Sequence, residues 1–175
     1  ERSVVIGAGT IGLMTLQAVV LGGSPWTAVV EPHPDRRAIA ADLGASAVYE
    51  SGDALAAAAG PAGVDVTFDA VGLDATRRLA LDLLRPGGCA VMVGLAGGET
   101  AIDFRDVVRR GLTLRGAYAY TDADYDEALA LLLDGRAGLG ELERVQPLDS
   151  GPEAFAELAA GPSSRLKVFL GPVTP

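Results

Sequence analysis

Three glycines near the start of the chain have a spacing that suits the binding of a phosphate group. Gly7, Gly9 and Gly12 follow the apolar run VVI and precede residues with the apolar spacing of a helix. The first glycine permits a tight turn, the second lets the main chain approach a pyrophosphate, and the third lets the helix pack closely on the sheet. The first N–H groups of the helix, at Thr10 and Ile11, would then face the anion.

A carboxylate at the end of the next apolar run extends this prediction from a phosphate to a dinucleotide. Glu31 closes the run TAVV and follows the glycines at the distance typical of a dinucleotide-binding fingerprint. Its carboxylate can accept hydrogen bonds from both hydroxyls of an adenosine ribose and would repel a 2′-phosphate, so NAD is predicted in preference to NADP. Arg36 and Arg37 could weaken that preference by offering positive charge. The alternative is that Glu31 and the two arginines form a solvated loop.

Residues 1–137 contain the elements that would position these groups. The predicted strands are Ser3–Ile6, Thr27–Glu31, Ala47–Tyr49, Val64–Asp69, Cys89–Val93 and Leu112–Tyr118. The predicted helices are Thr10–Leu21, Asp35–Leu43, Asp53–Ala59, Asp74–Leu84, Phe104–Arg109 and Tyr125–Leu133. This alternation predicts an α/β fold with a doubly wound, parallel six-stranded sheet, a Rossmann fold with strand order 3-2-1-4-5-6.

The pattern changes after residue 137, where a glycine-rich link is followed by shorter elements. Residues 138–175 are predicted to form a separate C-terminal segment with strands over Val145–Leu148 and Leu166–Leu170 and a helix over Pro152–Leu158. These pieces do not continue the strand–helix alternation. The sequence therefore predicts a dinucleotide-binding domain over 1–137 and a second segment over 138–175.

Composition excludes several function classes. The chain has 175 residues, 49% of them hydrophobic, and a net charge of −9 without a basic cluster, which disfavours nucleic-acid binding. It has one cysteine and one histidine, too few for a disulfide or for a zinc site of the usual type. No apolar run is long enough to span a membrane, and the first residues lack the pattern of a signal peptide, so a cytoplasmic location is expected.

With these residues in view, the chain resembles the nucleotide-binding half of the medium-chain alcohol dehydrogenase family, in its zinc-type branch. The similar stretches are VVIGAGTIGLMTLQAVVLGG, VVEPHPDRRAIAADLGAS, VDVTFDAVG, LRPGGCAVMVGLAGG, LTLRGAYAYTDADYDEALALLLDGR and RLKVFLGP, in the order of the family. They cover essentially the whole chain. The resemblance implies a parent activity in which an alcohol or polyol is reversibly oxidised to a carbonyl compound and hydride passes to NAD.

The resemblance also implies a set of cofactor contacts beyond the glycine loop and Glu31. These are Ala70, Val71 and Gly72 beside the adenosine and its ribose; Val93, Gly94 and Leu95 near the nicotinamide; Gly116, Ala117 and Tyr118 at the carboxamide; Arg36 at the adenosine ribose; and Lys167 near the pyrophosphate. A ligand is expected at the carboxyl ends of parallel strands on general grounds as well. For Val93, Gly94 and Leu95 the alternative is ordinary packing at a strand end.

In the family, the zinc ligands, the proton relay and most of the substrate pocket lie in an N-terminal catalytic domain that precedes the glycine loop. Because the loop starts at residue 7 here, we expect that domain to be absent and the chain alone to be inactive in hydride transfer. Zinc is accordingly expected only in the missing domain, and no catalytic or metal-binding residue is predicted within this chain. Residues from about 145 to 175 would belong to the catalytic domain and need cover from the rest of the chain or another chain.

Other residues with reactive side chains are expected to be structural. They are His33 on a solvated loop, Cys89 in a buried strand, Tyr118, Tyr120 and Tyr125 in packing or capping roles, and Asp65 and Asp69 as strand-end residues rather than an acid/base pair.

Two other functions fit part of the pattern, and one assembly is expected. A methyltransferase that uses S-adenosylmethionine has a similar sheet and glycine loop; a reversed seventh strand in the main sheet would support it. A non-catalytic domain that binds NAD(H) without turnover is the second alternative. The predicted edge strand, residues 112–118, is expected to pair with a second copy and form a homodimer.

Overall fold

The computed structural model describes residues 1–138, 145–161 and 166–172. The chain separates into two compact units, Glu1–Ala137 and Gly138–Pro175, and each is described by itself. Among the described residues, no helix is both long enough and apolar enough to cross a bilayer.

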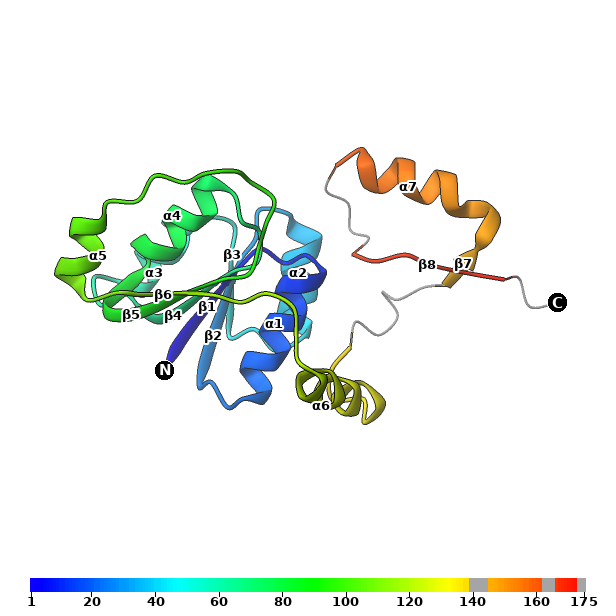
Figure 1. The fold of residues 1–175 in the computed structure, drawn as a ribbon, viewed down its shortest axis with the longest axis horizontal. Coiled ribbons are helices and arrows are strands. Elements are labelled where there is room, and N and C mark those ends of the chain that lie inside the picture. The colour runs from blue at the N-terminus through cyan, green and yellow to red at the C-terminus, as the bar shows by residue number, and fades with distance from the viewer. Residues whose placement is uncertain (139–144, 162–165, 173–175) are drawn as a thin grey trace. The chain divides into compact units, whose positions relative to one another are not determined.

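A parallel six-stranded sheet forms the centre of the first unit (Figure 1). Its strands are β1 (Arg2–Ile6), β2 (Trp26–Val30), β3 (Ala47–Tyr49), β4 (Val64–Asp69), β5 (Leu84–Met92) and β6 (Thr113–Gly116). The order across the sheet is β3-β2-β1-β4-β5-β6, and each neighbouring pair is parallel. The predicted fold class and strand order are therefore confirmed.

Helices connect the strands and cover both faces of this sheet (Figure 1). They are α1 (Thr10–Leu21), α2 (Pro34–Asp42), α3 (Gly52–Ala59), α4 (Asp74–Asp82) and α5 (Phe104–Arg110). A sixth helix of this unit, α6 (Asp122–Leu133), follows β6 and has no buried residue. Helices α1 and α2 lie on one face, whereas α3, α4 and α5 lie on the other, as right-handed crossovers require when the chain winds outward in both directions from β1.

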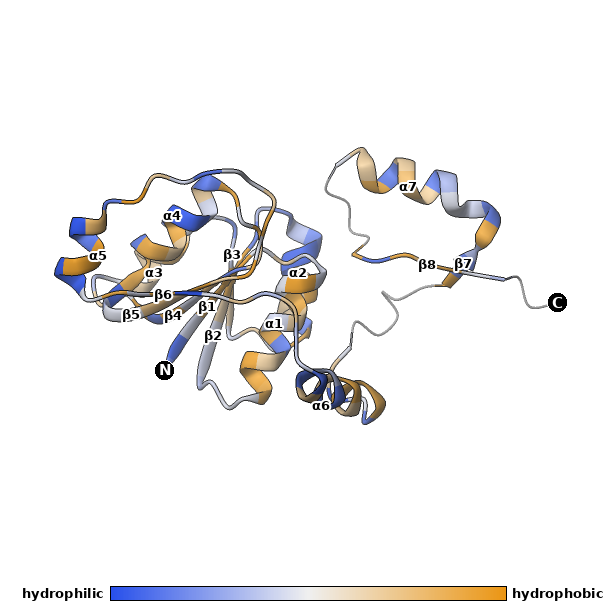
Figure 2. Cartoon of the chain, in the orientation of Figure 1, coloured by the Kyte–Doolittle hydropathy of each residue, from blue (hydrophilic) through white to orange (hydrophobic). Residues whose placement is uncertain are grey.

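The core lies where the central strands are covered on both faces. Val4, Val5 and Ile6 of β1 are at most 2% exposed, which matches their uninterrupted apolar sequence. Leu13 and Leu16 of α1 are fully buried against the sheet, and α1 is hydrophobic along almost its whole length (Figure 2). This packing fixes the direction in which the start of α1 points, and that start is the predicted anion site.

The segment around Pro86-Gly87-Gly88 differs from the prediction. We expected a helix up to Leu84 and a strand from Cys89, with these residues between them, but α4 ends at Asp82 and β5 begins at Leu84. The pairing of β5 with β4 shifts register there, between Val64↔Leu84 and Val66↔Cys89. An irregularity of this kind accommodates a proline, which lacks the N–H that a regular ladder needs. Strand β6 is also shorter than predicted, Thr113–Gly116 instead of Leu112–Tyr118.

The described part of the second unit contains a small parallel sheet, a short 3-10 helix and an α-helix. Its elements are β7 (Val145–Pro147), the short helix η2 (Leu148–Ser150), α7 (Gly151–Ala159) and β8 (Phe169–Gly171). Strands β7 and β8 pair in parallel. The predicted helix is present. The first predicted strand begins at Val145 as expected and ends one residue earlier, whereas the second begins at Phe169 instead of Leu166.

Candidate functional site

The three glycines form the turn from β1 into α1. Gly9 is the N-cap residue of α1, with φ −75° and ψ −175°, and no side-chain hydrogen bond caps the helix there. The first turn carries no acidic residue, so the positive end of the helix dipole is not compensated from within the helix. Ile11 is 55% exposed although it is apolar. The helix start is therefore open to solvent and electrostatically suited to an anion.

The glycines differ in what makes them necessary. A methyl group at Gly12 would collide with the carbonyl group of Gly7, and one at Gly7, where φ is +92°, would collide with the side chain of Val71. Gly9 has ordinary extended backbone, and a methyl group there would meet no described heavy atom within 4 Å. The fold itself therefore requires Gly7 and Gly12, whereas Gly9 borders open space that a Cβ would partly fill. The residues present fit the diphosphate of a dinucleotide at this point.

Glu31 lies at the end of β2 and is only 5% exposed. Its Oε2 accepts the Ala8 N–H at 2.8 Å, and its Oε1 accepts the His33 N–H at 2.8 Å. The carboxylate is thus tied to the glycine turn and to the loop ahead of α2. A carboxylate accepts about four hydrogen bonds, so both oxygens keep capacity for ribose hydroxyls. The alternative of a solvated Glu31 is wrong, because the residue is buried.

The loop after β2 is more ordered than its sequence indicated. His33 is the N-cap of α2 and is half-buried, with its Nδ1 buried and without a partner among the described residues. The expectation of a solvated histidine is wrong for this reason. Nη1 of Arg37 donates to the carbonyl oxygens of Glu31 and Pro32, at 2.7 and 2.8 Å. Arg37 therefore braces the loop, and Arg36, on the first turn of α2, is half-buried.

The loops after β4, β5 and β6 are joined by main-chain hydrogen bonds that continue past the strand ends. The Ala70 N–H donates to Ile6, the Val93 and Gly94 N–H groups donate to Asp69, and the Ala117 N–H donates to Met92. Each bond is 2.8–3.0 Å long. The structure thereby brings together six of the residues predicted from the resemblance. They lie at the carboxyl ends of the strands and are Ala70, Val71, Gly72, Val93, Gly94 and Ala117.

Two close contacts hold these loops against each other. The side chain of Val71 lies against Gly7, and the backbone of Gly72, with φ +84°, lies against the backbone of Gly94. Added methyl groups at Gly72 or Gly94 would overlap main-chain atoms of the opposite loop. Leu95 follows this contact and is 72% exposed, so strand-end packing does not explain its apolar side chain.

Other candidate residues lie apart from the carboxyl ends of the strands or have structural partners. Asp65 accepts hydrogen bonds from the Arg2 N–H and the Arg85 guanidinium near the start of β4, whereas Asp69 ends the strand. They do not form an acid/base pair. Cys89 is a half-buried free thiol within β5. Lys167 is exposed in the second unit, and its prediction as a pyrophosphate ligand stays untested.

The tyrosines predicted to pack or cap are largely exposed. Tyr118 is 86% exposed, so a packing role within the described residues is wrong for this side chain. Tyr120 is 73% exposed, but its ring packs against that of Tyr125. The rings of Tyr120 and Tyr125 lie 6.0 Å apart, at the beginning of α6. Thr121 and Asp124 form a capping box at the start of that helix.

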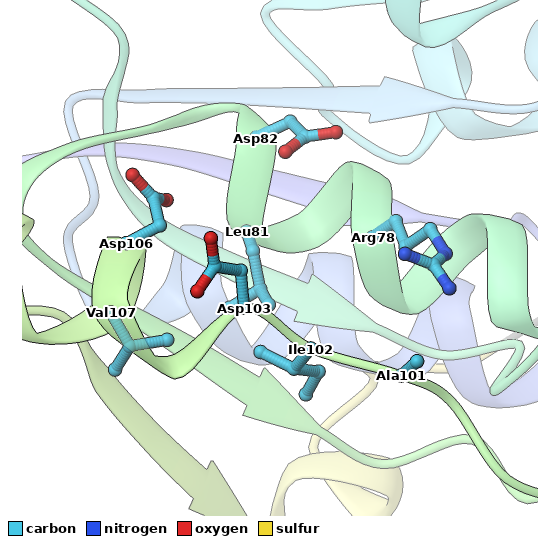
Figure 3. Close-up of a pocket in the computed structure, with 8 residues that line it drawn as sticks. All are labelled: Arg78, Leu81, Asp82, Ala101, Ile102, Asp103, Asp106 and Val107. Carbon is cyan, nitrogen blue, oxygen red and sulfur yellow. The ribbon is translucent and has the colours of Figure 1, made fainter.

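A pocket of about 280 Å³ lies between α4 and α5 (Figure 3), and none of residues 7–12 lines it. It is lined by Arg78, Leu81, Asp82, Ala101, Ile102, Asp103, Asp106 and Val107. Two of its three carboxylates are already paired, Asp103 with Arg105 and Asp106 with Arg110. The described residues contain no group of three potential ligands that could hold a metal ion. Zinc therefore does not fit any site in the described part of the chain.

Sequence reasoning missed two groups in this site. The Ala8 N–H lies within the glycine motif, but its bond to Glu31 depends on how β1 and β2 pair. The carboxylate of Asp69 accepts the N–H groups of Val71 and Gly72, at 3.0 and 2.9 Å. The sequence did contain a signal for the Asp69 carboxylate. An Asp three residues before a glycine at a strand end is typical of a turn stabilised by the Asp side chain.

Comparison with known proteins places this geometry in a family. The family model described as zinc-binding dehydrogenase matches residues 10–134. D-xylulose reductase A of Aspergillus oryzae is 28% identical over 171 residues, which are 92% of this chain and 48% of that protein. The chain spans about half the length of the curated relatives it matches.

Solved structures support the same family assignment. An alcohol dehydrogenase from Thermus sp. ATN1 superimposes with a TM-score of 0.86 at 28% identity, over 97% of this chain and 52% of that one. A zinc-binding dehydrogenase from Sinorhizobium meliloti, solved with NADP bound, superimposes with a TM-score of 0.86 at 26% identity, over 98% of this chain and 52% of that one. The glycine turn, the buried carboxylate after β2 and the matched sequence together show that this chain belongs to the zinc-binding dehydrogenase family and corresponds to its dinucleotide-binding part.

Proposed function

We propose that this chain binds NAD(H) as the cofactor-binding part of an alcohol or polyol dehydrogenase and that it transfers no hydride by itself. The whole protein would oxidise an alcohol to a carbonyl compound reversibly, with hydride passing to the nicotinamide ring. The turn at Gly9 would hold the diphosphate, Glu31 the adenosine ribose, and the loops at 70–72, 93–95 and 117 the rest of the cofactor. Zinc and the groups that polarise the substrate would come from a catalytic domain outside this chain.

The observation that carries the proposal is that Gly9, at the start of α1 where no side chain caps the helix, has open space beside it. Nothing described within 4 Å and nothing in its backbone angles requires a glycine at this position. A side-chain-free residue there is explained by a ligand that approaches the main chain closely. The uncapped start of α1 supplies the N–H groups and the dipole that favour a diphosphate.

NAD is proposed in preference to NADP because a buried carboxylate occupies the ribose position. Glu31 would face a 2′-phosphate with a negative charge that is desolvated and fixed by two N–H groups. Arg37 cannot readily serve a phosphate, since its guanidinium is bound to the Glu31 and Pro32 carbonyl groups. Arg36 is the cation that would bind the adenosine ribose.

The test is a calorimetric titration of the chain with NADH, NADPH and S-adenosylmethionine. We expect NADH to bind about tenfold more tightly than NADPH and S-adenosylmethionine not to bind. Gly9→Ala should unfold at a slightly lower urea concentration than the wild type, because alanine is a poorer N-cap than glycine, but bind NADH about tenfold or more weakly. Gly98→Ala is the matched control, because Gly98 also has open space around it and lies in a loop, and it should change neither property.

Three outcomes would contradict the proposal. They are equal NADH affinity for the wild type and Gly9→Ala, binding of S-adenosylmethionine in place of NADH, and NAD reduction by the isolated chain in the presence of an alcohol. The described main sheet already lacks the reversed seventh strand that would favour a methyltransferase, since all six strands are parallel. The alternative of a domain that only binds NAD(H) makes a different prediction from the proposal. If it were correct, adding the catalytic domain of the family would not produce turnover.

We also propose that the edge of the main sheet pairs with a second copy of the chain. Strand β6 is one of the two edge strands of the described sheet, the other being β3, and its four residues are exposed. An exposed edge presents main-chain groups without ladder partners, which suits pairing with an identical strand about a two-fold axis. Sedimentation at micromolar concentration should give a dimer; a monomer would contradict this part of the proposal. A cytoplasmic location stays a prediction.

A further inference from the structure

We propose that Asp69 is a positioning residue for the cofactor site and that its carboxylate holds the loop at residues 70–73 in the place where a dinucleotide needs it. The inference rests on the proposed dinucleotide binding. Asp69 ends β4, beside β1 and β5, at the point where the strand order of the sheet reverses. This is the point at which ligands bind in open parallel sheets.

Burial of this side chain requires an explanation. Asp69 is 1% exposed, and its Oδ2 has no hydrogen-bond partner among the described residues. A buried carboxylate oxygen without a partner is unfavourable, so packing alone would be served better by an apolar residue. An apolar residue, however, could not supply a hydrogen-bond acceptor in the position of Oδ1. Oδ1 accepts the N–H groups of Val71 and Gly72, at 3.0 and 2.9 Å.

These two hydrogen bonds place the loop between both halves of the site. On one side, the side chain of Val71 lies against Gly7 in the glycine turn. On the other side, the carbonyl oxygens of Val71 and Gly72 accept the N–H groups of Ala96 and Gly97, at 3.1 and 2.9 Å. The loop at 70–73 is therefore a spacer between the diphosphate turn and the loop after β5. A loop released by loss of Oδ1 would move both surfaces away from the cofactor.

The main chain of Asp69 strengthens this arrangement independently of its side chain. Its carbonyl oxygen accepts the N–H groups of Val93 and Gly94, at 3.0 and 2.8 Å. Any residue at this position would supply that carbonyl oxygen. Substitution of the side chain therefore separates the role of the carboxylate from the role of the strand end.

Three variants test the proposal by NADH titration and urea unfolding. Asp69→Ala removes Oδ1, and we expect NADH affinity to fall about tenfold. Asp69→Asn keeps an acceptor at Oδ1, and we expect affinity within about threefold of the wild type. Thr67→Val is the matched control, since Thr67 is fully buried on the same strand and donates to the Ala80 carbonyl oxygen of α4. It should unfold at lower urea and bind NADH as the wild type does.

Two affinity results would overturn the proposal while leaving NADH binding intact. One is Asp69→Ala binding NADH as tightly as Thr67→Val, and the other is Asp69→Asn losing as much affinity as Asp69→Ala. Failure of the wild type to bind NADH would instead contradict the proposed function. Hydrogen exchange of the wild type and Asp69→Asn gives a second measurement if Asp69→Ala does not fold. The Val71 and Gly72 amides should exchange as slowly as those of β4, and fast exchange at both would overturn the proposal.

Discussion

Oε2 of Glu31 accepts the Ala8 N–H at 2.8 Å and joins the end of β2 to the glycine turn across 23 residues of sequence. The residue proposed to bind the ribose therefore also shapes the loop proposed to bind the diphosphate. Because Glu31 is 5% exposed, this hydrogen bond is shielded from water, and its loss leaves a buried N–H without an acceptor.

Substitution of Glu31 should accordingly affect both stability and nucleotide preference. We expect Glu31→Ser to lower the free energy of unfolding by about 3 kcal/mol, since two hydrogen bonds to a buried carboxylate are lost. The preference for NADH over NADPH should weaken as well, because the charge that repels a 2′-phosphate is removed. Urea unfolding and parallel titrations with NADH and NADPH measure the two effects.

Glu50→Ser is the matched control, since Glu50 is exposed after β3, the strand that neighbours β2. It should change neither quantity. Unchanged affinities for both nicotinamide cofactors in Glu31→Ser would show that the ribose role of Glu31 is wrong. Unchanged stability would show that the bond to Ala8 contributes nothing.

Gly12→Ala should destabilise the fold much more than Gly9→Ala does. The added methyl group would collide with the carbonyl group of Gly7, where neither main chain can move without disturbing β1 or α1. We expect a loss of about 3 kcal/mol in the free energy of unfolding. Thermal and urea unfolding monitored by circular dichroism measure it. Equal stabilities of the two alanine variants would contradict the division of roles among the glycines.

Much of the fold was predictable because the chain encodes it locally. The apolar runs VVI and TAVV are buried on both faces, and strand–helix alternation leaves few topologies. Pro86, Gly87 and Gly88 were misassigned because local sequence rules treat them as helix stops. Their place inside β5 depends on the register of that strand with β4, which is a tertiary property.

The candidate site was predictable in part, for a similar reason. The glycine spacing and Glu31 are sequence-local signals, and the structure brings them together with the loops at 70–72 and 93–94. The burial of the Glu31 and Asp69 carboxylates was not predictable, because it depends on which loops close over the sheet edge. Lys167 lies in the second unit, and its contact with the pyrophosphate stays a prediction.

Arg110 should stabilise the end of α4 from the neighbouring helix. Its Nη1 donates to Asp106 at 2.9 Å, and its Nη2 donates to the carbonyl oxygens of Leu81, at 3.0 Å, and Leu84. Arg110→Ala leaves these carbonyl groups without their cap, and we expect about 2 kcal/mol lower stability in urea unfolding.

The matched control for Arg110 is Arg105→Ala. The Arg105–Asp103 pair is highly exposed, at 88% and 55%, and should contribute nothing measurable. Equal effects of the two substitutions would contradict the capping role of Arg110.

Stability should depend on pH through Asp65. The Arg2 N–H and then the Arg85 guanidinium hold the pKa of its carboxyl below the ordinary value of 3.8. Because the folded pKa lies below the unfolded one, the stabilisation is present above the unfolded pKa and is lost as pH falls through the folded pKa. The free energy of unfolding should therefore fall more steeply below pH about 4 in the wild type than in Asp65→Asn.

Urea midpoints measured from pH 6 downward test this dependence. Asp134→Asn controls for the loss of one exposed carboxylate and should keep the wild-type slope. Parallel curves for the wild type and Asp65→Asn would contradict the assignment.

The most direct test of the account is to locate bound NADH by amide-resolved nuclear magnetic resonance on the intact chain. The central claim is that main-chain N–H groups at the start of α1 hold the diphosphate. We predict that the largest shifts on addition of NADH fall at residues 7–12, at Glu31 and in the loops at 70–72 and 93–95. Shifts confined to the pocket between α4 and α5, or a glycine turn that does not respond, would contradict the claim.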